Sequence, residues 1–421
     1  MALVDDNEIR VALCMQLSVD RPASQTARKM TRGDLIVNPE RNFLETNQKA
    51  LFETTESHFL ETSSLPPECY KSDEFFQAEI DNIFFKYWLF VGREEKVPTA
   101  GDYFVFDLLG ESVIVLRNPE GGISAFQNFC RHRGARLLDG EGSVKMIRCP
   151  FHNWGYDLDG SLMGAPDMKK SINFAKEKNG LVPIRVETWE GFIFINFDTD
   201  AAPLMEFLGD LPDKMHGYQL QKMRCVMEKN HLVKCNWKLY TEVDMEDYHA
   251  PTVHPVSIGQ QVFPRQPSSG EYETTFFEYP RTVSVTSVDN GKIFPKIPGI
   301  SGKEATGTYF TMIYPGFFLV TTQDSSWWIN KLPETPTTTK VHVGYCFPES
   351  TVARDDFKDI SPRYISRWDM VIDEDNRICE RQQLGVNSRW CLPGRFSFHE
   401  EVVHAMNKWV IGKVYARRDE N

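Results

Sequence analysis

The alternation of apolar and polar residues changes character along the chain and divides it into regions of different predicted structure. After a proline-marked start near residue 66, apolar residues recur at helical spacing up to residue 87. From residue 88 to about 199 short alternating segments follow, and the Asn-Pro-Glu-Gly-Gly turn at 118–122 between two apolar runs predicts a hairpin. A small antiparallel β domain is therefore expected over 88–199.

Beyond residue 200 the pattern mixes the strand and helix periods. A segment that begins strand-like is expected to become helical near Trp237 and to stay helical towards His254. Several strands in series are expected between 272 and 350, one of them at 281–288, before long helical patterns return at the C-terminal end. An antiparallel sheet with a long helix laid over it predicts an α+β domain.

The 421 residues exceed the usual size of a single core, so more than one domain is expected. Residues 1–65 lack a steady period and are interpreted as an N-terminal extension with a helical patch at 41–51. We divide the rest into a helix at 66–87 that belongs to the larger domain, the β domain at 88–199 and the α+β domain at 200–421.

Composition narrows the functional class. The net charge of −12 argues against a nucleic-acid surface, and the apolar runs are too short for a membrane span. The N-terminus has early acidic residues and no basic region before an apolar run, so no secretory signal is expected. The nine cysteines are odd in number and scattered, which is typical of a reducing cytosol. We expect a cytoplasmic protein.

The first chemical motif pairs cysteine with histidine twice, as Cys130-x-His132 and Cys149-x-x-His152. Two thiolates on one iron and two imidazoles on the other are the ligands of a Rieske [2Fe–2S] cluster. A Cys2His2 zinc site needs the same residue types but usually groups cysteine with cysteine and histidine with histidine. The mixed pairs favour the cluster, in which each loop gives one ligand to each iron.

A second constellation lies downstream. His249 and His254 occur in a predicted helical stretch, and an Asp-Glu-Asp run at 373–375 lies inside the long amphipathic pattern. Two histidines and one carboxylate form the facial triad of non-haem Fe(II) oxygen-activating sites. Two nearby histidines are as often structural, and an acidic run is usually a solvated face. The predicted [2Fe–2S] cluster favours the iron site over structural histidines and a solvated acidic run, because an electron carrier needs an acceptor.

From about residue 65 to the C-terminus the chain resembles the catalytic α subunit of Rieske non-haem iron oxygenases, the ring-hydroxylating and demethylating family. The resemblance is most specific in three segments: 128–162, 235–255 and 374–386. It implies an all-β Rieske domain inserted near the start of a helix-grip α+β catalytic domain, with the helix at 66–87 as the N-terminal helix of the catalytic domain.

The resemblance also implies the site residues. Cys130, His132, Cys149 and His152 would hold the [2Fe–2S] cluster, and His249, His254 and Asp375 a mononuclear Fe(II). Asp375 is preferred to Asp373 because the family pattern continues with Glu380 and Gln383.

One position departs from the commonest family pattern. Glu246 stands where many members have Asp, at the position that bridges the cluster of one subunit to the iron of its neighbour, and it is expected to face His152 of another subunit. Glutamate there resembles the quaternary-amine monooxygenase branch. Val243 replaces a frequent Asn, which puts that residue's hydrogen bond in doubt.

The activity implied by the resemblance is hydroxylation or oxidative demethylation of a small aromatic or quaternary ammonium compound with O2. NAD(P)H would supply electrons through a separate reductase or ferredoxin, and the enzyme would be a homotrimer, as a mono- or dioxygenase. The alternative is a Rieske electron carrier without catalysis; the residues beyond 200 argue against it.

Two further features stay open. Basic residues surround the cluster ligands, either to dock an acidic electron donor or to neutralise the cluster: Arg131, Arg133, Arg136, Lys145 and Arg148. Aromatic residues of the second sheet either line a substrate pocket or form ordinary core: Phe276, Phe277, Tyr309, Phe310, Tyr314, Phe317, Phe318, Trp327 and Trp328.

Overall fold

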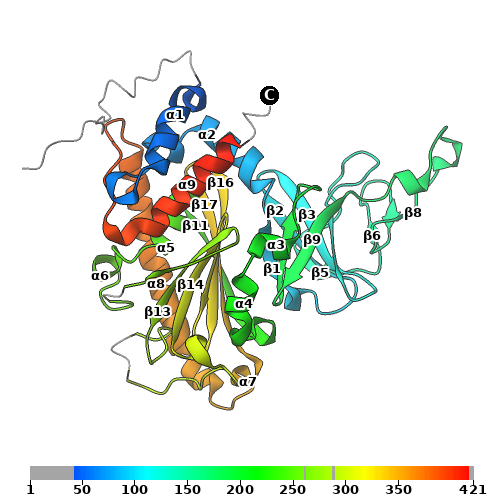
Figure 1. The fold of residues 1–421 in the computed structure, drawn as a ribbon. Helices are drawn as coiled ribbons and strands as arrows, with labels where there is room; N and C mark the ends of the chain where they lie inside the picture. Colours follow the sequence, from blue (N-terminus) through cyan, green and yellow to red (C-terminus); the bar gives the residue numbers. More distant parts are fainter. Residues whose placement is uncertain (1–41, 260–261, 287–289, 417–421) are drawn as a thin grey trace, which may run out of the picture. The chain divides into compact units, whose positions relative to one another are not determined.

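A computed structural model describes residues 42–259, 262–286 and 290–416 of the chain (Figure 1). Within it two seven-stranded antiparallel sheets each organise one part of the molecule. No helix among these residues has both the length and the apolar character needed to cross a membrane. The α+β class expected from the sequence is confirmed.

The first sheet builds the β domain, in the strand order β1-β10-β9-β4-β3-β2-β5. Its strands are β1 (Leu89–Arg93), β2 (Asp102–Leu108), β3 (Glu111–Arg117), β4 (Ile123–Gln127), β5 (Glu141–Ser143), β9 (Pro183–Trp189) and β10 (Phe192–Asn196). The predicted 118–122 hairpin is confirmed: it joins β3 to β4, and Asn118 N donates to Gly122 O at 2.9 Å.

A three-stranded sheet of β6 (Ile147–Arg148), β7 (Gly155–Tyr156) and β8 (Leu162–Gly164) extends the β domain. It has its own apolar core, in which Trp154 and Tyr156 pack with Cys130 and Cys149. The two cysteines are therefore held by buried aromatic residues at the base of their loops.

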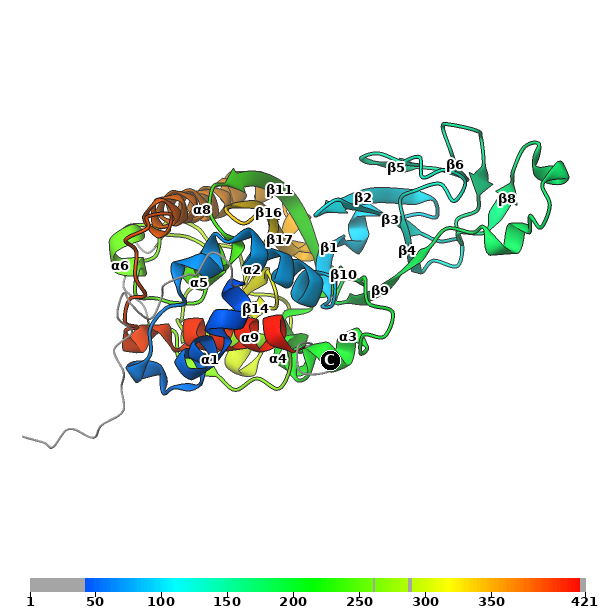
Figure 2. The same cartoon turned by 90° about the horizontal axis from the view of Figure 1, so that it is seen from above.

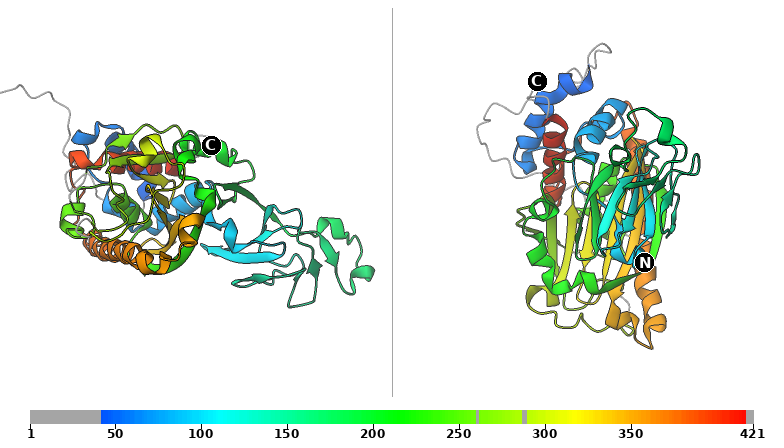
Figure 3. Two further views of the ribbon diagram at one scale, coloured as in Figure 1. Left: turned by 90° about the horizontal axis from the view of Figure 1, so that it is seen from below. Right: turned by 90° about the vertical axis from the view of Figure 1, so that its right-hand side faces the viewer.

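The second sheet has the order β11-β17-β16-β15-β14-β13-β12. Its strands are β11 (Met223–Val233), β12 (Arg265–Gln266), β13 (Tyr272–Glu278), β14 (Gly307–Ile313), β15 (Phe317–Thr321), β16 (Ser326–Thr335) and β17 (Thr338–Pro348). The long helix α8 (Phe357–Val386), orange in Figure 3, lies along one face of this sheet. This is the predicted arrangement of sheet and helix.

Alternate residues of the second sheet enter two different cores. On β16, Trp327 and Ile329 pack towards α8, whereas Trp328 packs on the other face. That other face meets the first sheet, where Phe90 of β1 stacks on Phe317 with ring centroids 4.2 Å apart. The period of two along each strand thus separates the face that can carry a site from the face that joins the two sheets.

The remaining helices connect and cover the sheets. They are α1 (Phe43–Glu56), α2 (Asp73–Glu79), α3 (Leu204–Leu208), α4 (Leu211–Met215), α5 (Trp237–Asp244), α6 (Ala250–Val253), α7 (Glu349–Val352) and α9 (Glu401–Tyr415). Helix α1 falls inside the segment expected to be an extension, yet it packs against α9 (Figures 1 and 2). Tyr415 Oη donates to Leu44 O at 2.9 Å. The rest of that expected extension, residues 1–41, lies outside the described part.

Two predicted elements differ from the structure. Residues 281–286 of the strand predicted at 281–288 contain a turn at 283–284 and bends instead of a strand, and 287–289 lie outside the described residues. Here the hydroxyl of Thr282 donates to Asp324 at 2.7 Å and that of Ser284 bonds the hydroxyl of Ser325 at 2.8 Å, so buried side chains replace a strand ladder. The helix that starts at Trp237 ends at Asp244, so the segment up to His254 is not one helix.

A buried ion pair joins α2 to α5. Lys238 Nζ lies 2.5 Å from Glu79 Oε1, and both side chains are fully buried. The rings of Tyr70, Phe75 and Trp237 surround the ammonium at 5.2–5.3 Å. Burial raises the pKa of Glu79, and the Lys238 charge opposes that rise.

Removing one partner would leave the other charge buried and unpaired. We expect Lys238→Ala to lower the free energy of unfolding by about 3–5 kcal/mol. Lys238→Met combined with Glu79→Leu should cost less, because no charge is then left uncompensated. Denaturant titrations of the three proteins check this; equal losses in the single and double variants would contradict it.

Candidate functional site

Both cysteine–histidine pairs lie on turns with the same backbone hydrogen bonds. The amide of Cys130 and that of Cys149 each donate to the carbonyl five residues on, at 2.8 Å in both. Each cysteine carbonyl accepts from the amide four residues on, at 2.8 and 3.1 Å. That fourth residue has positive φ in both turns, +73° at Gly134 and +60° at Asn153, which glycine and asparagine tolerate best. Two copies of one turn therefore present the four side chains.

The side chains of the two turns meet. The rings of His132 and His152 lie 4.7 Å apart between centroids. Both cysteines are buried, whereas His152 is exposed, so one edge of the group faces outward. Tyr156, which sequence reasoning did not single out, has its hydroxyl 3.3 Å from Cys130 Sγ.

The four side chains suit a two-iron cluster. Each turn supplies one thiolate and one imidazole, which is the ligand set of a Rieske cluster. Among the described residues, a group whose ligand atoms all converge, as a single metal ion requires, is found elsewhere.

The group that does converge is His249, His254 and Asp375. The two histidines flank the single turn of α6, His249 as its N-cap and His254 as its C-cap, and α8 supplies Asp375 from the other side. Asp375 Oδ1 lies 2.9 Å from His254 Nε2 and 3.7 Å from His249 Nε2, and the two Nε2 atoms are 3.1 Å apart. Asp373, the residue not preferred, is exposed.

The opposite nitrogen of each ring is occupied by a carboxylate. Glu246 Oε1 lies 2.6 Å from His249 Nδ1, and Glu374 Oε2 lies 2.7 Å from His254 Nδ1. Because a carboxylate only accepts, each Nδ1 donates to its carboxylate, and Nε2 of each ring is left on the side of Asp375. Asp375 Oδ1 is buried without a hydrogen bond, since its close contact with His254 lacks the geometry of one.

Two ring nitrogens and one carboxylate oxygen thus face one small space, as the ligands of a single metal ion do. Carboxylates on the far ring nitrogens are the usual outer partners of metal-bound histidines. Burial lowers the pKa of His249, but the hydrogen bond and charge of Glu246 and the charge of Asp375 outweigh it, so this pKa is raised above its ordinary value. The residues present therefore fit a mononuclear iron.

Other charged groups near the triad were not predicted from the sequence. Lys331 of β16 is fully buried and pairs with Asp244 at the end of α5; burial lowers the pKa of the lysine and raises that of Asp244 to about 6. Arg367 of α8 is also buried. No local spacing signals these residues, because Lys331 and Asp244 lie far apart in the sequence and Arg367 is buried only by the folding of α8 onto the sheet.

The nine aromatic residues of the second sheet divide between its faces. Four of them pack in the core away from α8: Phe276, Tyr309, Phe317 and Trp328. Phe277, Phe310, Phe318 and Trp327 belong to the face towards α8, and Tyr314 there stacks on Trp409 of α9. Phe263 joins this second set, 4.6 Å from Phe310 between ring centroids. Sequence alternation alone does not reveal which set faces the helix that carries Asp375.

The basic residues around the cluster turns are only partly neutralised within the chain. Arg136 bonds Asp107 at 3.0 Å and Asp139 at 2.7 Å. The other four are exposed and have no carboxylate within 4.0 Å among the residues that the structure describes: Arg131, Arg133, Lys145 and Arg148.

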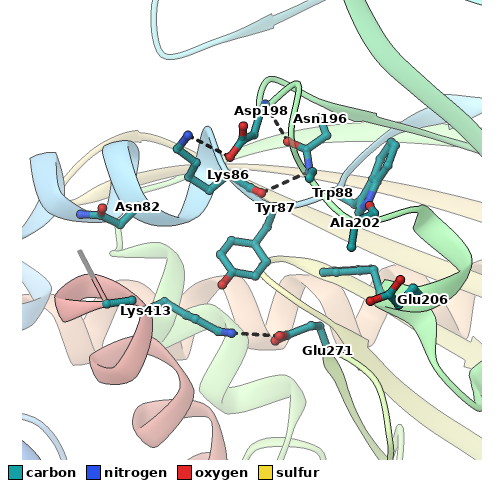
Figure 4. Close-up of a pocket in the computed structure, with 13 residues that line it drawn as sticks. Asn82, Lys86, Tyr87, Trp88, Asn196, Asp198, Ala202, Glu206, Glu271 and Lys413 are labelled. Atoms are coloured by element: carbon teal, nitrogen blue, oxygen red, sulfur yellow. Dashed lines mark hydrogen bonds and ion pairs between the residues drawn. The ribbon is translucent and has the colours of Figure 1, made fainter. Parts of the chain in front are cut away.

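A cavity of about 390 Å³ lies apart from both metal candidates (Figure 4). Its lysines are paired, Lys86 with Asp198 at 2.9 Å and Lys413 with Glu271 at 2.9 Å. None of the predicted ligands lines it, so we do not assign the chemistry to this cavity.

Comparisons with known proteins agree with this organisation. Residues 87–189 match the family described as Rieske [2Fe-2S] domain, and 214–415 match Ring hydroxylating alpha subunit (catalytic domain). Together the two matches cover more than half of the chain.

Relatives and a solved structure extend these matches. The glycine betaine monooxygenase oxygenase subunit of Chromohalobacter salexigens is 28% identical over 79% of this chain and 82% of that protein. The carnitine monooxygenase oxygenase subunit of Escherichia coli K12 is 33% identical over 46% of this chain and 53% of that protein. Naphthalene 1,2-dioxygenase from Rhodococcus sp. shares the fold, with a TM-score of 0.75 at 19% identity over 90% of this chain and 99% of that chain.

The presence of a catalytic domain beside the Rieske domain excludes the simple electron carrier. The chain belongs to the Rieske non-haem iron oxygenases, as an oxygenase component with a [2Fe–2S] domain and a mononuclear iron domain that works with a separate electron donor.

Proposed function

We propose that this oxygenase oxidises a small quaternary ammonium compound, and that the residues predicted from the sequence hold its metals. The convergence of His249 Nε2, His254 Nε2 and Asp375 Oδ1 on one space carries the proposal for the mononuclear site. Cys130 and Cys149 would hold one iron of the cluster, and His132 and His152 the other. Bound there, the cluster supplies single electrons and the mononuclear Fe(II) supplies activation of O2.

Glu246 has two tasks in this proposal. Its Oε1 bonds Nδ1 of His249, and its Oε2 accepts from the backbone amides of Tyr248 and His249, which fixes the carboxylate beside His249. A carboxylate has lone pairs for further donors, so it can also accept from His152 of a neighbouring subunit.

The family resemblance implies a head-to-tail homotrimer, and two exposed aromatic residues suit an interface of that kind. Tyr248, 60% exposed, follows Glu246 in the chain, and Phe151, 56% exposed, precedes His152. Apolar groups exposed beside both ends of the electron path suit a heterologous interface, in which the two faces belong to different surfaces of the subunit.

The substrate proposal rests on the relatives and on the aromatic face towards α8. Two relatives are named for glycine betaine and carnitine, and Glu246 stands at the bridging position. Phe263, Phe277 and Phe310 are only partly buried. Aromatic faces attract quaternary ammonium groups, and carboxylates of the site add to the attraction. Aromatic hydrocarbons are the second candidate, supported by the shared fold alone.

The ligand assignment of the cluster is tested with Cys149→Ser. We expect loss of the Rieske absorption and EPR signals and a fall from about three irons per chain to about one, because the other metal site is independent. Circular dichroism should show that the second domain stays folded. Cys391→Ser, at a free and partly exposed cysteine, is the matched control. Retention of the EPR signal would contradict the assignment.

The role of Glu246 is tested with Glu246→Ala and Glu246→Gln. The alanine variant should keep both metals and lose about 100-fold in coupled substrate oxidation, since outer partners of metal ligands typically carry that much activity. The glutamine variant keeps an acceptor and should retain more. Stopped-flow reoxidation of the reduced cluster locates the defect. Near wild-type oxidation by the alanine variant would refute the bridge.

The substrate class is tested by coupled consumption of NADH and O2 with a surrogate reductase. Oxidation of an N-methyl group consumes one NADH, one O2 and one proton, and yields the demethylated amine in its protonated form, formaldehyde, water and NAD+. We expect formaldehyde in step with O2 for glycine betaine or carnitine. Coupled oxygenation of naphthalene without any turnover of quaternary ammonium compounds would reverse the order of the two candidates.

A further inference from the structure

Arg367 lies on α8 eight residues before Asp375. At 1.5 Å per residue this places their backbones about 12 Å apart along the helix axis, and a spacing of eight keeps both on the same face. That face packs against the second sheet, and only 3% of Arg367 is exposed. A buried guanidinium therefore lies within the length of a small molecule from the proposed iron ligands.

The contacts of Arg367 leave most of its donors unused. Its Nε donates to Ser257 O at 3.3 Å, and its guanidinium carbon lies 5.3 Å from the ring centroid of Trp327. In 42–259, 262–286 and 290–416, no carboxylate comes within 4.0 Å of it, and no hydrogen bond from either terminal nitrogen is found. Both terminal nitrogens of the guanidinium are thus available to bind one ligand together.

Other buried cations of the same domain are paired. Lys238 has Glu79 and Lys331 has Asp244. Burial lowers the pKa of Arg367 to about 10, so it remains charged at neutral pH. An enclosed charge without a partner is costly, and such a group usually meets an anion in the functional state.

The nearest acidic groups do not supply that anion. Glu374 and Asp375 act on Arg367 through their charge, but Glu374 bonds His254 and Ser257, and Asp375 faces the two imidazoles. The alternative interpretation is that Arg367 only balances the negative charge of these acidic groups. It explains why a cation lies near the site, but not why the two terminal nitrogens of the guanidinium have no hydrogen-bond partner.

Arg367 also terminates the aromatic face towards α8. From the guanidinium the rings continue through Trp327 to Phe310, 6.5 Å between centroids, and from Phe310 to Phe263 and Phe318. Aromatic faces suited to a cation and a guanidinium suited to an anion therefore lie side by side. A ligand that satisfies both features carries a positive and a negative group, and is therefore a zwitterion.

We infer that Arg367 binds a carboxylate of the substrate through its two terminal nitrogens, so that the enzyme selects quaternary ammonium compounds that carry a carboxylate. The inference rests on the proposed substrate class. The bidentate match of guanidinium to carboxylate gives both affinity and orientation. It fixes the end of the substrate that is not oxidised and leaves the quaternary nitrogen to the neighbouring aromatic rings.

The test compares pairs of ligands that differ in the carboxylate. Binding to the anaerobic holoenzyme is measured by calorimetry for carnitine, its methyl ester, glycine betaine and choline. With Arg367→Gln we expect carnitine and glycine betaine to bind roughly 10- to 100-fold more weakly, and the ester and choline to change less than about threefold. Arg367→Lys, which keeps the charge but not the fork, should recover only part of the loss.

Controls separate binding from structure. Arg377→Gln removes an exposed arginine from the same helix and should change no ligand's affinity. Iron content, the Rieske EPR signal and the thermal midpoint of Arg367→Gln should match the wild type. In turnover the same variant should raise KM for the carboxylates with little change in kcat. Equal weakening of charged and neutral ligands, or iron loss with unchanged carboxylate preference, would overturn the inference.

A second pair separates this inference from the substrate class. Benzoate and benzyl alcohol differ in the same group without a quaternary nitrogen. If no quaternary ammonium compound binds but benzoate binding depends on Arg367, then Arg367 does bind a carboxylate and the proposed quaternary ammonium substrate is wrong. If Arg367→Gln alters the binding of no carboxylate, the inference fails whichever substrate class is correct.

Discussion

The organisation of the catalytic domain depends on where the protons of two imidazoles are held. Glu246 and Glu374 keep the Nδ1 protons of His249 and His254, and this alone turns both Nε2 lone pairs towards Asp375 Oδ1. If either carboxylate were replaced by an apolar group, its ring would lose the partner that orients it, while the three metal ligands themselves would remain. The outer carboxylates therefore hold the two rings in the orientation in which both Nε2 atoms face Asp375.

Helix α8 collects the groups that this arrangement needs. One helix supplies Asp375 to the triad, Glu374 to His254, and Gln383, whose Oε1 accepts from Asn236 N at 2.7 Å just before α5 begins. A helix held along a sheet by many buried side chains is stiff, so the relative positions of these groups are set by helical geometry rather than by loops. The histidines, in contrast, flank a single helical turn, and their positions rely on the bonds to Glu246 and Glu374.

The sequence revealed those parts of the site in which local spacing carries the chemistry. Cys130 to His132 and Cys149 to His152 are short pairs on tight turns, and the spacing that a turn requires is visible in a string of letters. Lys331, Asp244 and Arg367 were not visible, because their roles arise only when β16, α5 and α8 come together. The strand predicted at 281–288 failed for a related reason. Thr282 and Ser284 look like strand residues, but their hydroxyls are used by the buried Asp324 loop, a partner about forty residues away.

The charges around the aromatic face connect the fold to selectivity. The triad and its outer carboxylates make one end of the region negative, and a metal dication offsets only part of that charge. A cationic group is favoured there, while a carboxylate would be repelled by Glu246, Glu374 and Asp375 unless a positive group met it first. Arg367 lies where it can do so, about two helical turns from Asp375. The orientation of a zwitterion in this region is thus set both by attraction of its carboxylate to Arg367 and by repulsion of that carboxylate from the acidic residues at the triad. Because the reversed orientation is excluded, an N-methyl group, rather than the carboxylate, lies next to the site of oxidation.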